Sequence, residues 1–459
     1  MTRTANLATR LAEAAGTHSV VAAPEELVNY SVDGLSPAVV VQPSSAAEVV
    51  EVVKFALAEK LKVVPFGSGS KCEIGMAPTR YEIAVDISAM REVAHYDAGD
   101  LTLSVDAGMT MRELEAFLKP HGQFLPLAVP CFESATVGGT VASGVDSVLR
   151  RQYGTARDFL LGAEFVDGKA KLCKSGGRVV KNVTGYDLHK LLIGSLGTLG
   201  IITRLNFRTF PMQPVSGGYV ANFSRGTEAL DYRERLENSG LPLTNVEVID
   251  SETMQIIRAI LWRVESRVFS AIEDAAWCVY SSFEGSEAVT RRISGELQKL
   301  GGDSGAGHRE VLESGADEVL GGMLREAFEW LRYASPATIL YRLAICGKIK
   351  EAVEELISAA ESLSLRSALL VRAAGIIYFA LLAEKEEAML APAPKIDSVV
   401  VPLARKYGGH ATLMHAPLSA KLKITEARLQ RGDAVLQSRV KKVFDPSDIF
   451  VPGRMVGGI

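Results

Sequence analysis

The chain has 459 residues and a mass of 49.3 kDa, enough for two or three domains at roughly 100–200 residues each. Hydrophobic residues make up 47% of it and charged residues 23%, which excludes the disordered and fibrous classes of protein. Fifty basic and 54 acidic side chains give a formal net charge of −4, so we expect no broad electrostatic attraction to nucleic acid or anionic lipid.

Capping signals predict two helices in the first part of the chain. Ser45 is followed three residues later by Glu48, and Thr110 is followed in the same way by Glu113. In each pair the hydroxyl and the carboxylate can accept hydrogen bonds from the free N–H groups of a first helical turn. The second helix is expected to stop at Pro120, because proline cannot continue a helix.

Short β-rich runs around these helices predict strands. The run 62–66 is the first of them. Two later runs flank Asp167-Gly168, and because both residues tolerate a positive φ, we expect a tight hairpin there. Apolar and polar residues alternate from 201 to 210, which predicts a strand with one solvent-facing side.

After residue 214 strands alternate with longer, charged helices. We expect strands near 217–223, 245–249, 277–283 and 338–345, and helices near 227–237, 288–300, 317–332 and 348–362. This order predicts a separate α+β domain of the split β-α-β kind, with a sheet covered on one face. We therefore divide the chain into residues 1–212, 213–400 and 401–459, the last packing back on the first.

We expect a cytoplasmic protein without a membrane span. The N-terminal stretch 1–16 has no continuous apolar run of the kind that a signal peptide needs. The most apolar later run, 367–383, is interrupted by Arg372 and is shorter than the roughly 20 residues that cross a bilayer.

The cysteines predict neither a disulfide framework nor a zinc or iron–sulfur site. They are five, they are scattered, and no two form a C-x-x-C pair: Cys72, Cys131, Cys173, Cys278 and Cys346. If the protein transfers electrons, another cofactor has to carry them.

Three glycine-rich segments are candidates for ligand binding. The segment 64–71, Val-Pro-Phe-Gly-Ser-Gly-Ser-Lys, directly follows a predicted strand, and its amides and hydroxyls suit a pyrophosphate. It matches neither the P-loop nor the Rossmann fingerprint. The small-residue segments 135–144 and 194–203 could join it on one extended ligand. The alternative is that these glycines serve only tight turns, and spacing alone leaves both interpretations open.

Seven motifs in a fixed order resemble the FAD domain of the vanillyl-alcohol oxidase/PCMH flavoprotein family. They are P-x-G-x-G-S at 65–70, V-D-I-S-A-M at 85–90, V-D-A-G-M-T at 105–110, A-T-V-G-G at 135–139, R-Q-Y-G at 151–154, K-N-V-T-G-Y-D at 181–187 and G-S-x-G-T-L-G-I-I-T at 194–203. The resemblance is close over about 38–210 and extends to the tail D-P-x-x-I-x-x-P-G-R-M at 445–455. Within the family the phrases at 177–187, 194–200 and 408–413 are most similar to the FAD-binding subunit of glycolate oxidase.

The resemblance implies a fold and a set of cofactor contacts. The fold is α+β, with a PCMH-type FAD-binding domain of two α+β subdomains and a ferredoxin-like α+β cap domain. The implied FAD contacts are Pro65, Gly67, Ser68, Gly69, Ser70 and Lys71 in the first segment, Thr136, Gly138, Gly139, Thr140, Ser143 and Gly144 in the second, Gly200, Ile201 and Ile202 in the third, and Arg454 in the tail.

Two absences refine that expectation. Family members that attach FAD through histidine carry it on the first loop, where this chain has Lys71 and Cys72, and Ser134 stands where a cysteinyl link would be. FAD is therefore expected to be non-covalent. The metal segment H-G-D-G-N-x-H of the family's 2-hydroxyacid dehydrogenases is missing, so we expect no catalytic metal.

Two residues are candidates for the chemistry of acid oxidation. Arg342 lies in an apolar predicted cap strand and resembles the arginine of the subunit's W-R-L segment, so it could bind a carboxylate; the alternative is a salt bridge or a solvent-facing side chain. His410 follows two glycines and could act as a base, although a lone histidine is more often structural. His415 is expected on the opposite face of the same extended segment.

Two functions of different class follow. The first is an FAD-dependent oxidoreductase for a glycolate- or D-lactate-like 2-hydroxy acid, working in a complex with a companion flavoprotein and an iron–sulfur subunit. The second is an FAD-binding electron-relay or structural subunit without turnover, which is favoured by the missing metal segment and by Leu196 in place of the family's more usual glutamate. A stand-alone oxidase for another alcohol, such as a sugar acid, is a third possibility.

Overall fold

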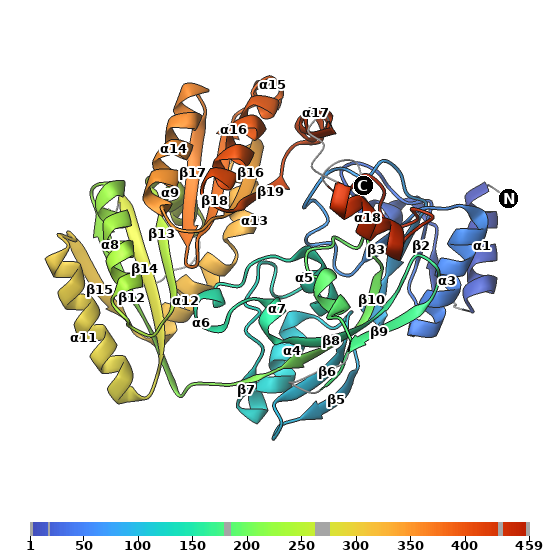
Figure 1. The fold of residues 1–459 in the computed structure, drawn as a ribbon, viewed down its shortest axis with the longest axis horizontal. Helices are drawn as coiled ribbons and strands as arrows, with labels where there is room; N and C mark the ends of the chain where they lie inside the picture. Colours follow the sequence, from blue (N-terminus) through green and yellow to red (C-terminus); the bar gives the residue numbers. More distant parts are fainter. Residues whose placement is uncertain (1–2, 17–18, 179–184, 262–275, 430–434, 456–459) are drawn as a thin grey trace.

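The computed structural model describes residues 3–16, 19–178, 185–261, 276–429 and 435–455, which form two lobes (Figure 1). Residues 179–184, and with them most of the K-N-V-T-G-Y-D motif, lie outside the described part. No helix within the described residues is long and apolar enough to cross a bilayer.

The first subdomain is a small sheet with helices beside it. Its four strands lie in the order β1 (Val20–Val21), β2 (Val39–Val41), β4 (Ile83–Asp86), β3 (Val63–Phe66), parallel except for β1. The accompanying helices are α1 (Arg3–Ala15), α2 (Pro24–Leu27) and α3 (Ala46–Glu59). The capping prediction for α3 is confirmed, because the Ser45 hydroxyl accepts a hydrogen bond from the Glu48 amide.

The second subdomain is an antiparallel sheet of five strands. Their order is β5 (Val93–Asp97), β6 (Thr102–Asp106), β10 (Ile201–Arg208), β8 (Leu160–Val166), β9 (Leu172–Gly176). The predicted hairpin around Asp167 joins β8 to β9, and the predicted capping box of Thr110 and Glu113 opens α4 (Met111–Leu118). The remaining elements are α5 (Val137–Ser143), α6 (Arg150–Tyr153), α7 (Ala156–Phe159) and the two-stranded pair β7 (Gln123–Phe124) with β11 (Phe210–Pro211).

The other lobe is built on one antiparallel sheet of eight strands. They are β12 (Val215–Phe223), β13 (Leu243–Ile249), β14 (Trp277–Gly285), β15 (His308–Leu312), β16 (Ala337–Ala344), β17 (Arg366–Arg372), β18 (Ile376–Ala383) and β19 (His410–His415). Their order in space is β15-β12-β14-β13-β17-β18-β16-β19. Numbered within each group of four, the strands lie 4-1-3-2, so the lobe consists of two split β-α-β units side by side. The α+β expectation, with a ferredoxin-like cap, is confirmed.

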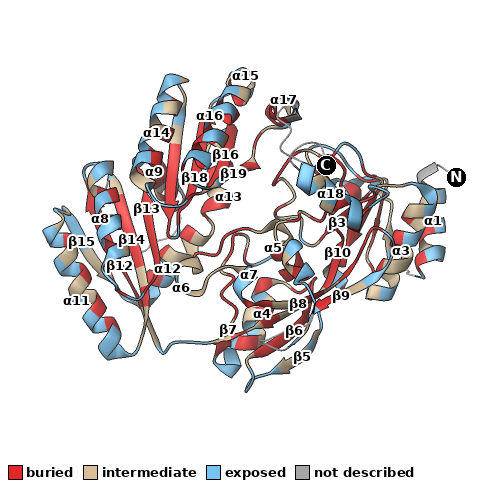
Figure 2. Ribbon diagram, in the orientation of Figure 1, coloured by how far each residue is buried: buried red, intermediate tan, exposed pale blue. Residues whose placement is uncertain are grey.

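Helices cover both faces of this sheet, so the expectation of one covered face is wrong. The outer face carries α8 (Gly226–Asn238), α11 (Glu287–Asp303), α14 (Ile349–Ser362) and α16 (Ala393–Lys406), and these share a core with it (Figures 1 and 2). The inner face packs against α9 (Ser251–Leu261), α12 (Ser314–Arg325) and α13 (Ala327–Arg332), in a core continuous with the first lobe. The predicted helix over 317–332 is thus two helices.

A buried ion pair joins the two units of the sheet. β13 and β17 pair over only three residues, and Arg372 Nε lies 2.7 Å from Glu247 Oε1 at this seam, with both side chains almost fully buried. The apolar run 367–383 forms two paired strands, β17 and β18, rather than one long segment. Arg372, which interrupts the run, has its partner on the neighbouring strand.

The last segment divides between the two lobes, which differs from the expectation that all of 401–459 packs on the first domain. β19 adds to the edge of the large sheet beside β16. After α17 (Leu418–Leu429) and α18 (Val435–Phe444) the chain reaches the small sheet, where the Val63 amide donates to the Ile449 carbonyl at 2.7 Å and the Val451 amide to the Val63 carbonyl at 2.9 Å. The domain borders stay a prediction.

Lys441 fixes this tail in place. Its buried ammonium donates to the Thr198 and Phe450 carbonyls at 2.8 and 2.7 Å and to Asp445 Oδ2 at 2.7 Å. Three acceptors satisfy all three N–H groups of the lysine. The tail, the 194–203 segment and α18 are therefore held at one point.

We predict that Lys441→Met lowers stability, because it leaves a buried carboxylate and two carbonyls without their donor. Loss of one partner of a buried pair costs about 3–5 kcal/mol. Thermal unfolding should show a melting temperature several degrees lower than that of Lys442→Met, the exposed neighbour on the same helix. Equal melting temperatures for the two variants would contradict this role.

Candidate functional site

The three glycine-rich segments converge on one cavity. It holds about 770 Å³ of empty space, including its open mouth. All the implied FAD contacts line it except Thr140 and Gly144, which line neighbouring cavities. Phe66, Ala142, Leu196 and Gly197 of the same segments also line it, and so do Val32 and Val451, which carry no sequence signal of their own.

Glycines let the segments approach one another closely. A Cβ at Gly67 would lie 2.2 Å from Thr136 Oγ1, and a Cβ at Gly138 would lie 2.6 Å from the Cβ of Ala107. A Cβ at Gly144 would lie 2.9 Å from the Cα of Gly194. Such distances leave no room for a side chain, so these glycines serve close approach between segments rather than turns alone.

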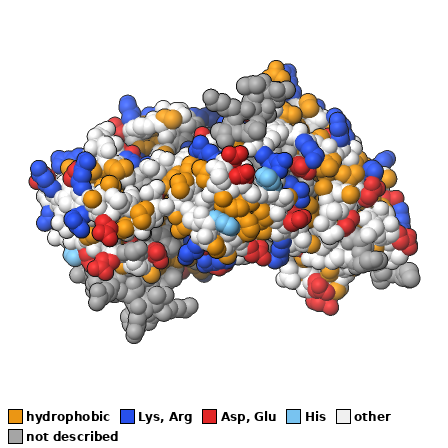
Figure 3. All heavy atoms as spheres, turned by 90° about the horizontal axis from the view of Figure 1, so that it is seen from below, with side chains coloured by type: hydrophobic (Ala, Val, Ile, Leu, Met, Phe, Trp, Pro, Cys, Tyr) orange, Lys and Arg blue, Asp and Glu red, His pale blue; other side chains and the backbone are white. Residues whose placement is uncertain are grey.

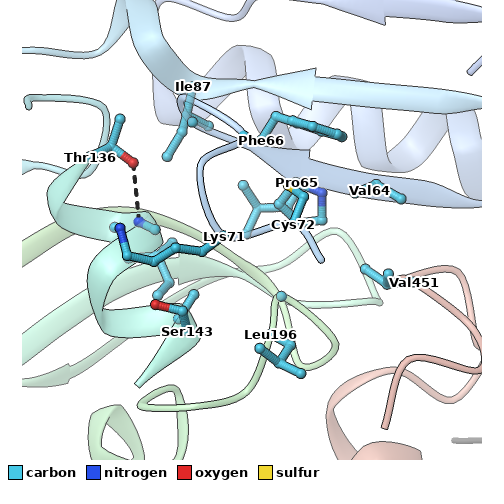
Figure 4. Close-up of a pocket in the computed structure, with 18 of the residues that line it drawn as sticks. Val64, Pro65, Phe66, Lys71, Cys72, Ile87, Thr136, Ser143, Leu196 and Val451 are labelled. Atoms are coloured by element: carbon cyan, nitrogen blue, oxygen red, sulfur yellow. Dashed lines mark hydrogen bonds between the residues drawn. The ribbon is translucent and has the colours of Figure 1, made fainter. Parts of the chain in front are cut away.

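Backbone amides in the first segment are free, whereas those of α5 are used. Within the described part of the chain the amides of Ser68, Gly69 and Lys71 donate no hydrogen bond. In contrast, the amide of Gly138 donates to the Ala107 carbonyl at 2.8 Å, and that of Gly139 to Thr136 Oγ1 at 3.2 Å (Figure 4). An anion in this cavity would therefore find its backbone donors on the first segment.

Lys71 adds a buried cation to the same cavity. Its side chain is 8% exposed and extends toward the first turn of α5 (Figure 4). Its Nζ reaches Ser70 Oγ at 3.4 Å, and no carboxylate oxygen among the described residues lies within 4.0 Å of it. Burial lowers the pKa of Lys71, because the charged form loses its hydration.

A second, larger cavity adjoins the first; we call it the reaction cavity. The two share Ser143, Leu196 and Arg454, and the reaction cavity holds about 1680 Å³ including its open mouth. The ionisable side chains that line it are Arg342, Arg405, His410, Arg428 and Arg454, and among the described residues no Asp or Glu does. Such a lining suits an anionic ligand.

Two of these arginines, Arg428 and Arg454, contact acceptors that do not line the cavity. Arg428 makes a forked contact with the buried Asp397, its Nη2 lying 2.6 Å from Oδ1. Arg454 donates to the Cys72 carbonyl, and its Nη1 lies 3.8 Å from Asp33 Oδ2 without a hydrogen-bond partner in the described chain. The arginines are thus fixed before any ligand arrives.

Arg342 links the lobes through an ion pair. Its Nε donates to the buried Asp146, which also accepts from Arg150. The salt-bridge interpretation is therefore correct for Nε, while neither Nη group donates to a described protein acceptor. Sequence analysis did not single out Asp146, although it lies two residues after the small-residue segment 135–144.

His410 lies beside Arg342 at the rim of the reaction cavity. Its backbone pairs with Ala344, and Arg342 pairs with Thr412, which places both side chains on the same face of the sheet. Partial burial and the nearby Arg342 lower the pKa of His410, so its ring is neutral at pH 7. His415 does not line the reaction cavity, and its Nδ1 lies 2.7 Å from Glu73 Oε2.

Two thiols lie near the first cavity and stay protonated. Cys72 lines the cavity, and the Cys131 Sγ lies 4.0 Å from the Ser70 carbonyl. Burial raises the pKa of Cys72 to about 11 and that of Cys131 to about 12. Because the thiolate is the reactive form, neither is an activated nucleophile.

Two protein families match the chain. The FAD binding domain family matches residues 37–176, and the family described as FAD linked oxidases, C-terminal domain, matches residues 215–455, more than half of the chain.

Curated relatives match most of the sequence. The mitochondrial D-lactate dehydrogenase (cytochrome) of Arabidopsis thaliana is 27% identical over 427 residues, covering 92% of this chain and 73% of the relative. The glycolate oxidase subunit GlcE of Escherichia coli strain K12 is 29% identical over 415 residues, covering 88% of this chain and 95% of the relative.

The fold is also that of a solved flavoprotein structure. The crystal structure of p-cresol methylhydroxylase with substrate bound aligns over 100% of this chain and 98% of its own, with a TM-score of 0.75 and 16% identity. The resemblance to PCMH-type flavoproteins is confirmed. The chain belongs to the FAD-linked oxidase family, and it is an oxidoreductase whose cofactor is FAD.

Proposed function

We propose that this chain oxidises a small 2-hydroxy acid of the glycolate or D-lactate type. The observation that carries the proposal is the reaction cavity, which adjoins the first cavity and whose ionisable lining, among the described residues, is arginine and histidine alone. A carboxylate substrate needs such cations, and a lining without Asp or Glu does not repel it. The names of the relatives, D-lactate dehydrogenase and glycolate oxidase subunit, support the same substrate class.

FAD would lie between the three glycine-rich segments. The free amides of Ser68, Gly69 and Lys71 and the Lys71 ammonium suit its diphosphate, while the close-packed glycines of α5 leave room beside it. Arg454, at the junction of the two cavities, would contact the end of the cofactor that faces the substrate. When bound, FAD supplies the acceptor for the hydride of the hydroxy acid.

Arg342 and His410 would act on the substrate. The Nη groups of Arg342 can bind the carboxylate while Asp146 holds the Nε and fixes the plane of the guanidinium. A general base must be unprotonated to accept a proton. Because its pKa is lowered, the ring of His410 is neutral and can accept the hydroxyl proton at one of its nitrogens.

The decisive experiment is anaerobic mixing of the FAD-loaded chain, alone, with glycolate or D-lactate while flavin absorbance is followed near ~450 nm. We expect bleaching by at least one acid. If neither acid bleaches the flavin, the second candidate gains: an electron-relay or structural subunit that depends on a companion flavoprotein and an iron–sulfur subunit. Similarity to GlcE, and also to subunit GlcD of Bacillus subtilis, favours a place in such a complex under either outcome.

We predict that Lys71→Met weakens FAD binding by about tenfold or more, because it removes the cation next to the diphosphate. The same change should raise the melting temperature of the FAD-free protein, since a buried charge without a carboxylate partner is costly. Titration with FAD and thermal unfolding measure the two effects. The exposed Lys299→Met is the matched control, and unchanged FAD affinity in Lys71→Met would refute the assignment.

FAD is predicted to be non-covalent, because both nearby thiols are protonated and no histidine lies on the first loop. Acid precipitation should therefore release all the yellow colour into the supernatant. A coloured pellet that becomes colourless in Cys72→Ala or Cys131→Ala would show a cysteinyl link instead.

We predict a division of roles between Arg342 and His410. Arg342→Lys keeps the charge beside Asp146 but loses the fork, so the acid concentration for half-maximal flavin reduction should rise by about tenfold. His410→Ala should slow flavin reduction at saturating acid by about 10²–10⁴-fold. His308→Ala, an exposed histidine on β15, is the control. Bound FAD should remain in all three, and unchanged reduction kinetics would remove the role of the residue concerned.

A further inference from the structure

A third cavity adjoins the reaction cavity. It shares Gly144, Ile193 and Arg342 with the reaction cavity and holds about 750 Å³ including its open mouth. Its remaining wall comes from the end of the second glycine-rich segment, from the region of α6 and α7, and from Lys190. Of these three shared residues, Arg342 is the charged one.

Four cations surround this third cavity, which we call the basic antechamber. They are Arg150, Arg157, Lys190 and Arg342, and Asp146 is the one carboxylate among its described lining residues. On the face of the molecule drawn in Figure 3, by contrast, basic and acidic side chains are interspersed. A chain with a net charge of −4 therefore gathers cations at this position.

The ion pairs of the antechamber do not neutralise all of its positive charge. Asp146 is shared between Arg150 and Arg342, so one carboxylate serves two guanidinium groups. Lys190 pairs with the exposed Asp187, with its Nζ 2.8 Å from Oδ2. Arg157 is exposed and makes no ion pair or hydrogen bond with the described protein. Like charges in a partly enclosed space repel one another unless an anion joins them.

We propose that the basic antechamber is a second anion site, which captures the carboxylate of the substrate before the substrate enters the reaction cavity. The proposal rests on the proposed function, since it assumes a small carboxylate as substrate. Cavities lined by one sign of charge raise the local concentration of the opposite ion and speed its arrival. Arg342 would bind the anion in turn from the antechamber side and from the reaction side.

The test uses oxalate, an inert dianion that cannot be oxidised as a hydroxy acid, with the FAD-loaded chain. Calorimetric titration should give a dissociation constant that rises with salt, because partly exposed charges are screened. Arg157→Glu and Lys190→Glu should each weaken oxalate about fivefold or more and flatten the salt dependence. Two substitutions guard against loss of folding in one of them, and circular dichroism checks both.

Charge reversal outside the cavity is the matched control. Arg291→Glu and Lys299→Glu on α11 are exposed and change the net charge by the same amount. If oxalate does not bind, or binds equally to the antechamber and control variants, the antechamber proposal is wrong.

The same samples are then mixed anaerobically with glycolate and D-lactate. If oxalate binding depends on Arg157 and Lys190 but neither acid reduces the flavin, the anion site stands and the proposed function fails. If an acid reduces the flavin while the Arg157 and Lys190 substitutions leave the oxalate affinity unchanged, the proposed function stands and the antechamber proposal fails.

Discussion

Close backbone approach among three small-residue segments is the constraint on which the rest of this structure depends. Gly67 lies against Thr136, Gly138 against Ala107 and Gly144 against Gly194, at distances that exclude any side chain on the glycines. These contacts bring the loop after β3, helix α5 and the segment before β10 around one cavity. The amides of Ser68, Gly69 and Lys71 in the first loop donate no hydrogen bond within the described chain, whereas the amides of Gly138 and Gly139 in α5 are bonded inside the protein. The shape of this cavity is therefore set by packing before any polar contact is made.

Charge pairs then align the second lobe with this cavity. The Glu247–Arg372 pair joins the two units of the eight-stranded sheet, and Arg342 with Asp146 joins that sheet to α5's domain. Buried pairs of this kind contribute little net stability, since each charge loses its hydration. Their value here is orientation, because each guanidinium has a carboxylate acceptor at a defined position in another part of the chain. The inner face of the cap sheet consequently presents Arg342 and His410 to the reaction cavity in a fixed arrangement.

Basic side chains line all three cavities. Lys71 lines the first cavity, arginines and His410 line the reaction cavity, and two further arginines and Lys190 line the basic antechamber beside Arg342. Shared lining residues connect each cavity to the next: Arg454 between the first two and Arg342 between the last two. A protein with an overall negative charge thus contains three adjoining cavities in which basic side chains outnumber acidic ones, and anionic ligands suit such a lining.

The sequence by itself determined the features that depend on neighbours along the chain. The helix starts at Ser45 and Thr110, the hairpin at Asp167 and the glycine-rich segments follow from local capping, turn and steric rules. Only the tertiary structure decided which distant groups meet. It paired Arg342 with Asp146, added β19 to the cap sheet and placed Lys441 on the Thr198 carbonyl. These contacts join residues up to hundreds of positions apart, and nothing in local propensity or spacing encodes which buried charge finds which partner.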